Sequence, residues 1–216
     1  MVSCSTCFDL SEINPCSQEE VDTKISLYIF NMASKQGIKK VKIRTVDTDV
    51  VVIAVSTFHR LCIDHLWIDF GTGKNRKLYA IHNIHSQLGQ DKAEALLFFH
   101  AFTGCDQVSY FNSIGKKKAW KTWMAMDNMT DVFKVLSKLP SLENVQDSME
   151  MISRYTVVMY NRTSNSANVN EARRTLFVKD GKDLDSIPPT ESALLEHVSR
   201  AAYVSGHIWY VTGNKN

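Results

Sequence analysis

The stretch IRTVDTDVVVIAV, residues 43–55, constrains the fold more than any other part of the chain. Valine, isoleucine and threonine dominate it, which is typical of a buried β-strand, and we predict a strand over residues 40–55. Asp47 and Asp49 interrupt this strand. Because strand side chains alternate, both carboxylates would lie on one face, roughly 6–7 Å apart. Either the strand ends early and the acids are solvated in a loop, or a divalent cation binds them.

The size and composition of the chain limit the classes of protein to which it can belong. Its 216 residues suit one domain, or one domain with appendages, and a hydrophobic content of 44% is enough for a core. The formal net charge is only +2, so a nucleic-acid partner would have to be recognised by local basic clusters.

No apolar run approaches the roughly 20 residues of a membrane span, so we expect no membrane partner. The five cysteines are irregularly spaced, which favours an intracellular location over a disulfide framework.

The order of the predicted elements favours an α/β fold with a helical C-terminal extension. We expect a helix from Gln18 to Gly37, capped by Ser17, before the strand, and a hairpin of residues 66–71 and 77–81 after it. Residues 105–126 are interpreted as a turn that leads into a helix. The remaining helices are predicted at residues 81–89, 92–104, 130–139, 142–160 and 190–204.

A second acid lies close to a basic turn further along the chain, in the sequence GCDQVSYFNSIGKKK. Asp106 follows an apolar helix and a glycine turn. Gly115 then precedes a helix that begins with three lysines, and a glycine turn at a helix N-terminus exposes backbone N–H groups suited to a phosphate. A solvated start of a basic helix is the alternative interpretation. Lys39, Lys40, Lys42 and Arg44 precede the acid pair Asp47 and Asp49, and we expect them to flank a bound phosphate as well.

Taken together, these segments resemble the flap-endonuclease family of structure-specific nucleases, which has a PIN-like α/β fold. The resemblance is carried by Asp47-Thr48-Asp49, by Gly104-Cys105-Asp106 and by the Ile-Gly turn and basic helix after it, over residues 18–123. It implies an incomplete PIN-like parallel sheet flanked by helices, with a helix-two-turn-helix that grips duplex or branched DNA. The segments implied are an irregular N-terminus (1–17), a PIN-like core (18–125), a helical extension (126–160), a polar loop or linker (161–189) and a C-terminal helix and tail (190–216).

The resemblance also implies a set of site residues. Catalysis would fall to Asp47, Asp49 and Asp106, and Mg²⁺ or Mn²⁺ would be held by these three together with Glu20 and Asp22. Two such ions activate the attacking water and stabilise the leaving oxygen in phosphodiester hydrolysis. The residues implied to bind nucleic acid are Ser113, Gly115, Lys116, Lys117, Lys118 and Lys121.

The chain departs from the family's pattern at its start. The family's fold begins with a strand that supplies two further aspartates, whereas this chain begins just before the Glu20 helix, so we expect a truncated copy or a fragment with a weakened second metal site. The C-terminal part is similar to animal open reading frames that look derived from mobile elements. A DNA partner implies a nuclear location. The alternatives to a nuclease are an inactive remnant that still binds nucleic acid and an α/β protein-interaction domain.

Overall fold

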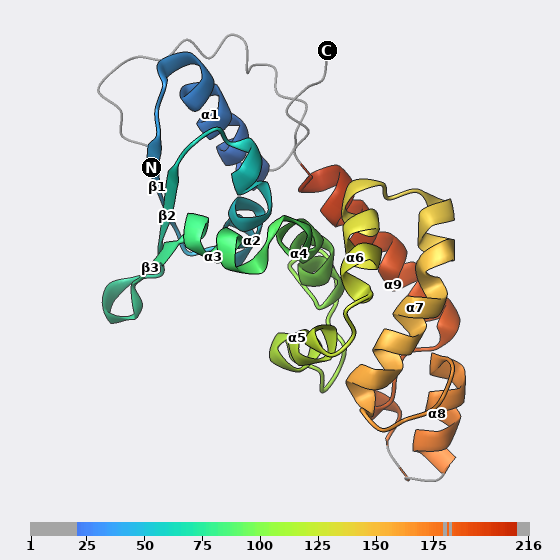
Figure 1. The fold of residues 1–216 in the computed structure, drawn as a ribbon. Coiled ribbons are helices and arrows are strands. Elements are labelled where there is room, and N and C mark those ends of the chain that lie inside the picture. The colour runs from blue at the N-terminus through green and yellow to red at the C-terminus, as the bar shows by residue number, and fades with distance from the viewer. Residues whose placement is uncertain (1–20, 179–180, 182, 211–216) are drawn as a thin grey trace. The chain divides into compact units, whose positions relative to one another are not determined.

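The computed structural model describes residues 21–178, 181 and 183–210 (Figure 1). The chain divides into two compact units, the first reaching to Glu94 and taking in the residues from Ile208 onward, the second comprising Ala95–His207. The predicted core at residues 18–125 is therefore divided, and the boundary falls inside one helix, α4 (Gln90–Phe102). Within the described ranges, no helix is both long enough and apolar enough to cross a membrane.

The first unit is built around a small sheet. Its elements are α1 (Val21–Gln36), β1 (Lys40–Thr45), α2 (Thr48–Thr57), β2 (His65–Phe70), β3 (Lys77–Ala80) and α3 (Ile81–Leu88). Short 3₁₀ turns follow α2 at Phe58–Arg60 and β2 at Gly73–Asn75. The chain is thus α/β as predicted, with helix as the main element.

The sheet is mixed, which corrects the expectation of a parallel sheet. Its strand order is β1-β2-β3, in which β1 and β2 run parallel and β2 and β3 run antiparallel. The antiparallel pair confirms the predicted hairpin, whose two strands are connected by residues 71–76. The inward face of β2 is fully buried, with Leu66 and Ile68 at 0% exposure. Figure 1 shows α1 and α2 beside the strands of this unit.

The predicted strand over residues 40–55 is wrong beyond Thr45. The strand ends there, and Asp47 becomes the N-cap of α2, its carboxylate accepting the backbone N–H of Asp49 at 2.8 Å. An aspartate at this position stabilises a helix start. The β-branched run that follows forms a helix because it is buried on nearly all sides, with Ile53 at 1% and Val55 at 2% exposure. The strand therefore ends early, as one of the two alternatives had it, but the acids begin a helix and do not lie in a loop, and the binding of a cation stays a prediction.

The second unit is entirely helical over its described residues. It contains the rest of α4, α5 (Lys116–Met124), α6 (Met129–Lys138), α7 (Leu142–Tyr160), α8 (Val169–Val178) and α9 (Glu191–Tyr203). The helix α8 lies within residues 161–189, which corrects their interpretation as a loop or linker. Its Val169, Ala172 and Leu176 are buried at a helical spacing that the polar composition of the segment concealed.

Edge-on and tilted aromatic rings form the core of the second unit. The ring of Phe133 lies 5.1 Å from that of Trp123, 5.3 Å from that of Tyr155 and 5.4 Å from that of Phe98. The Tyr155 hydroxyl donates a 2.8 Å hydrogen bond to the Ala119 carbonyl, which fixes α5 against α7. Trp123 is fully buried, whereas the lysines of α5 are exposed.

Candidate functional site

The connection between α4 and α5, residues 103–115, is built from two tight turns. In the first, Cys105 and Val108 exchange backbone hydrogen bonds of 2.9 and 3.3 Å. In the second, the N–H of Ile114 donates to the Phe111 carbonyl at 3.1 Å. Gly104 has φ of +106°, and a Cβ added to it would lie 2.7 Å from the Cβ of Tyr110. The segment is therefore a helix, two hydrogen-bonded turns and a helix, with a glycine that the first turn requires.

Lys116 joins the two helices at the base of this connection. Its ammonium donates to the His100 carbonyl at 2.9 Å, to the Thr103 hydroxyl at 3.0 Å and to the Gly104 carbonyl at 2.5 Å. An ammonium has three N–H donors, so the end of α4 engages all of them. Lys116 was predicted to bind a phosphate, but this geometry makes it a link that holds the start of α5 against the end of α4.

His197, on α9, supports the same connection from a distant part of the sequence. Its Nε2 lies 2.8 Å from the Phe102 carbonyl, and its ring packs against Phe102 and Phe111 at centroid distances of 5.3 and 4.7 Å. Burial lowers the pKa of His197, although its bond to the Phe102 carbonyl opposes that effect. The neutral ring donates a hydrogen bond from Nε2 to the Phe102 carbonyl. This carbonyl lies at the end of α4 and has no partner within the helix. Sequence reasoning missed this residue because no local pattern connects positions 95 residues apart.

The N-terminus of α5 is an exposed cationic feature of this unit. Gly115 is the N-cap and has no side chain to accept a bond from the first turn. Ser113, at φ of +62°, and Gly115 are both exposed. Lys117, Lys118 and Lys121 are exposed as well, while Ala119 and Trp123 are buried. Lys117 and Lys121 are four residues apart and share one side of the helix.

The acid pair belongs to the first unit and lies just beyond the carboxyl end of β1. One oxygen of Asp47 accepts the cap bond from Asp49, and within the described residues no hydrogen bond or ion pair engages its other oxygen. Asp22 lies in the first turn of α1, and Glu20 lies outside the described residues. Asp106 is exposed in the α4–α5 connection, in the second unit, so its convergence with Asp47 and Asp49 stays a prediction. Among the described residues, no three or more His, Cys, Asp or Glu side chains cluster as a metal ion would require.

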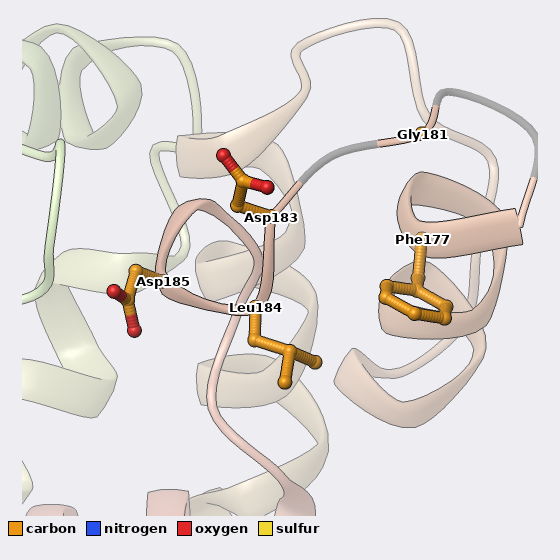
Figure 2. Close-up of a pocket in the computed structure, with 5 residues that line it drawn as sticks. All are labelled: Phe177, Gly181, Asp183, Leu184 and Asp185. Atoms are coloured by element: carbon orange, nitrogen blue, oxygen red, sulfur yellow. The ribbon is translucent and has the colours of Figure 1, made fainter.

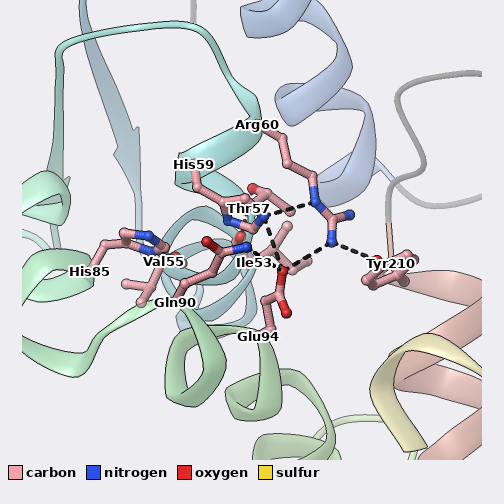
Figure 3. Close-up of polar contacts among 9 residues, drawn as sticks. All are labelled: Ile53, Val55, Thr57, His59, Arg60, His85, Gln90, Glu94 and Tyr210. Atoms are coloured by element: carbon pink, nitrogen blue, oxygen red, sulfur yellow. Dashed lines mark hydrogen bonds and ion pairs between the residues drawn. The ribbon is translucent and has the colours of Figure 1, made fainter. Parts of the chain in front are cut away.

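A polar cluster around Glu94, shown in Figure 3, was also missed from the sequence. The Glu94 carboxylate is 2% exposed, and its Oε1 lies 3.1 Å from Nε2 of His59 and 3.6 Å from the Arg60 guanidinium. Arg60 in turn donates to the Tyr210 hydroxyl at 2.6 Å and lies over the Tyr210 ring at 4.2 Å. These contacts hold the chain near Tyr210 against the first unit, and we interpret the cluster as structural.

A shallow pocket lies between the end of α8 and the 3₁₀ turn at Leu184–Ser186 (Figure 2). Its volume is about 550 Å³, and it is lined by Phe177, Gly181, Asp183, Leu184 and Asp185. Figure 2 shows the carboxylates of Asp183 and Asp185 directed away from Phe177 and Leu184. Binding sites for small molecules instead combine an apolar cavity with polar groups that converge on it. We therefore assign this pocket no ligand.

Comparison with known proteins gives no relative for this chain. No protein-family model matches it, no curated protein matches it in sequence, and no solved structure matches it in fold. Its function must therefore be argued from its own geometry.

Proposed function

We propose that this protein binds the sugar–phosphate backbone of DNA through α4, the two turns and the N-terminus of α5, in the manner of a helix-two-turn-helix. The observation that carries the proposal is the glycine-capped start of α5 with its exposed Lys117, Lys118 and Lys121. A helix N-terminus attracts anions because its backbone N–H groups and its dipole face the ligand.

The rest of the connection supports this role by making the start of α5 rigid. Lys116 and His197 satisfy carbonyls at the end of α4, and Gly104 permits the close approach of Tyr110. A preorganised site loses little conformational freedom when it binds, which favours affinity. Contacts of this kind position the phosphate backbone without reading bases, so binding should be insensitive to sequence and should weaken steeply with salt. A DNA partner would accord with a nuclear location.

A second candidate function is Mg²⁺-dependent phosphodiester hydrolysis, as in the flap-endonuclease family. The observation that favours it is the position of Asp47 and Asp49 just past the carboxyl end of β1, where the parallel pair β1–β2 ends. Ligand sites of α/β proteins gather at that edge. The uncommitted oxygen of Asp47 is a ligand of the kind that Mg²⁺ prefers, and Mg²⁺ needs only one or two carboxylates beside its waters. Asp47 and Asp49 would hold the ion at this edge of the sheet, and the ion would supply an activated water.

The test of DNA binding is fluorescence anisotropy with labelled duplex and branched DNA at several salt concentrations. The double variant Lys117→Gln/Lys121→Gln should bind more weakly than the wild type and should lower the salt slope by about 1.8, since each lost phosphate contact removes about 0.9. The matched control is Lys134→Gln/Lys138→Gln on α6, which removes the same charge from another helix of the unit. Equal losses in both double variants, or no binding of DNA at low salt, would refute the proposal.

The test of hydrolysis uses the same DNA with millimolar Mg²⁺ or Mn²⁺. Asp49→Asn should abolish cleavage without weakening binding at α5. Binding without any cleavage by the wild type would instead support the inactive nucleic-acid-binding alternative.

A further inference from the structure

One face of strand β1 carries a row of exposed cations. Lys40, Lys42 and Arg44 alternate with the half-buried Val41, Ile43 and Thr45, so the three basic side chains lie on the same face of the strand. Successive members of the row are roughly 6.6 Å apart along the strand. No other strand among the described residues pairs with the outer edge of β1.

The neighbouring strand adds an aromatic pair to this face. The parallel register sets Lys40 beside His65, Lys42 beside Trp67 and Arg44 beside Asp69. The rings of His65 and Trp67 are stacked, with centroids 5.2 Å apart and an interplanar angle of 19°. His82 packs edge-on against both rings, at 4.8 and 5.1 Å, and so fixes their orientation. Both His65 and Trp67 are half-buried, so neither residue is closed off from solvent.

The charge of this face remains positive after its own ion pair is counted. Asp69 is 5% exposed and is bound in a two-pronged contact by Arg76, the largest cause of the lowered pKa of the Asp69 carboxyl. Arg76 balances the charge of this acid, and Arg44 and Lys42 lower the pKa of Asp69 by weaker charge interactions, so the net charge of the face stays positive. Within the described residues none of the three takes part in an ion pair.

We propose that this face binds single-stranded nucleic acid, with Lys40, Lys42 and Arg44 on successive phosphates and the Trp67–His65 pair against a base. A flat row of cations beside an aromatic platform is the combination that holds single strands without sequence preference. A duplex offers the cations its phosphates but keeps its bases stacked inside, so it cannot use Trp67. The row also leads toward Asp47, two residues beyond the end of β1. The inference does not rest on the role proposed for α5, which lies in the other unit.

The experiment is fluorescence anisotropy of the full chain with a labelled oligothymidylate, measured as a function of salt. We expect Lys40→Gln/Lys42→Gln to weaken binding about tenfold at low salt and to lower the salt slope by about 1.4, since each phosphate contact to a single strand contributes about 0.7. The matched control is Lys74→Gln/Lys77→Gln. It removes the same charge from the β2–β3 hairpin of the same unit, and the register sets Lys77 beside Phe70, on the opposite face of the sheet. This control should bind as the wild type does.

A second pair of measurements separates stacking from charge. Trp67→Leu should weaken binding of the oligothymidylate and leave the salt slope unchanged, whereas Trp67→Phe, which keeps an aromatic ring, should bind more tightly than Trp67→Leu. Circular dichroism melting identifies any variant that fails to fold. If Trp67→Leu does not fold, Trp67→Phe is compared with the wild type, and it should bind the oligothymidylate more weakly with an unchanged salt slope, because its ring offers less surface for stacking. Equal weakening by the two double lysine variants, or equally effective competition by polyglutamate, would overturn the inference and leave the row of cations as a feature that keeps an edge strand from pairing. Loss of duplex binding in the α5 variants would leave this result unchanged.

Discussion

The Lys116 ammonium lies 2.9 Å from the His100 carbonyl, so the first residue of α5 is bonded to the last turn of α4. Two further bonds from the same ammonium, to Thr103 and Gly104, close the connection at its base. This lysine therefore differs in role from Lys117, its neighbour in the sequence, although both are exposed and carry the same charge.

Replacing Lys116 with Met should lower the free energy of unfolding by about 1.5–3 kcal/mol, because hydrogen bonds from a charged donor are lost and carbonyls at the end of α4 lose their partner. Lys117→Met should change stability by less than about 0.5 kcal/mol, as surface substitutions usually do. Urea denaturation of both variants followed by circular dichroism measures the difference. Equal stability of the two variants would show that the Lys116 bonds do not form in solution.

Replacing Gly104 with Ala should destabilise the protein by about 2–4 kcal/mol. The φ of +106° disfavours any side chain, and the new Cβ would meet the Cβ of Tyr110 at 2.7 Å. The control is Gly115→Ala, since Gly115 has an ordinary φ of −79° and no atom within 4 Å of an added Cβ. Thermal melting should rank Gly104→Ala far below Gly115→Ala. The reverse ranking would contradict the turn described for residues 103–115.

The stability of the protein should fall as the pH drops below about 6.5, the ordinary pKa of histidine. Burial lowers the pKa of His197 in the folded state, so the unfolded chain binds a proton more readily. The contribution is therefore complete above about pH 6.5 and is lost as the pH falls toward the lowered pKa of the folded state. Urea denaturation at several pH values measures it.

The variants for this pH series are His197→Gln and His207→Gln. The first keeps a donor for the Phe102 carbonyl but cannot titrate, so it should lose part of the pH dependence. His207 is exposed on the turn that follows α9, and its replacement should leave the dependence intact. A pH dependence that persists unchanged in His197→Gln would assign it to another group.

Millimolar Mn²⁺ or Mg²⁺ should raise the melting temperature of the wild type if Asp47 and Asp49 hold a cation. A ligand that binds the folded state alone stabilises it by about 2.7 kcal/mol at a concentration 100 times its Kd. Asp49→Asn should be slightly more stable than the wild type without the ion, because it removes one of two like charges, and should lose most of the response. Differential scanning fluorimetry with and without the ion measures both effects. An identical response in the two proteins would leave the resemblance to nucleases without a metal site.

Several elements were predictable because their signals are local. The hairpin of β2 and β3 follows from two short apolar runs separated by glycines, and α7 and α9 follow from apolar residues at helical spacing. The end of α1 at Gln36 follows from Gly37, whose φ of +63° suits glycine. The start of α5 in the candidate site was predictable as well, because a glycine turn before a run of lysines locates it.

Other features were not predictable because they depend on partners distant in the sequence. The run of residues 50–55 has the composition of a strand, yet it forms α2 because the first unit buries nearly every side of it. The helix α8 was missed because its buried side is narrow and its composition polar. Nothing near Lys116 or His197 in the sequence indicates that both bond the end of α4.

The sequence by itself determined where this chain turns and where its charged residues cluster. Asp47, Gly104 and Gly115 act through their own backbone and the next few residues, so their effects are encoded locally. Tertiary structure alone decided what each charge does. Hydrogen bonds to the end of α4 made Lys116 a link between helices, while the pairing of β1 with β2 brought Lys42 beside Trp67. The reason is physical: a side chain's role depends on which donors, acceptors and apolar surfaces the fold brings within a few ångströms of it, and residues far apart in the sequence supply most of these.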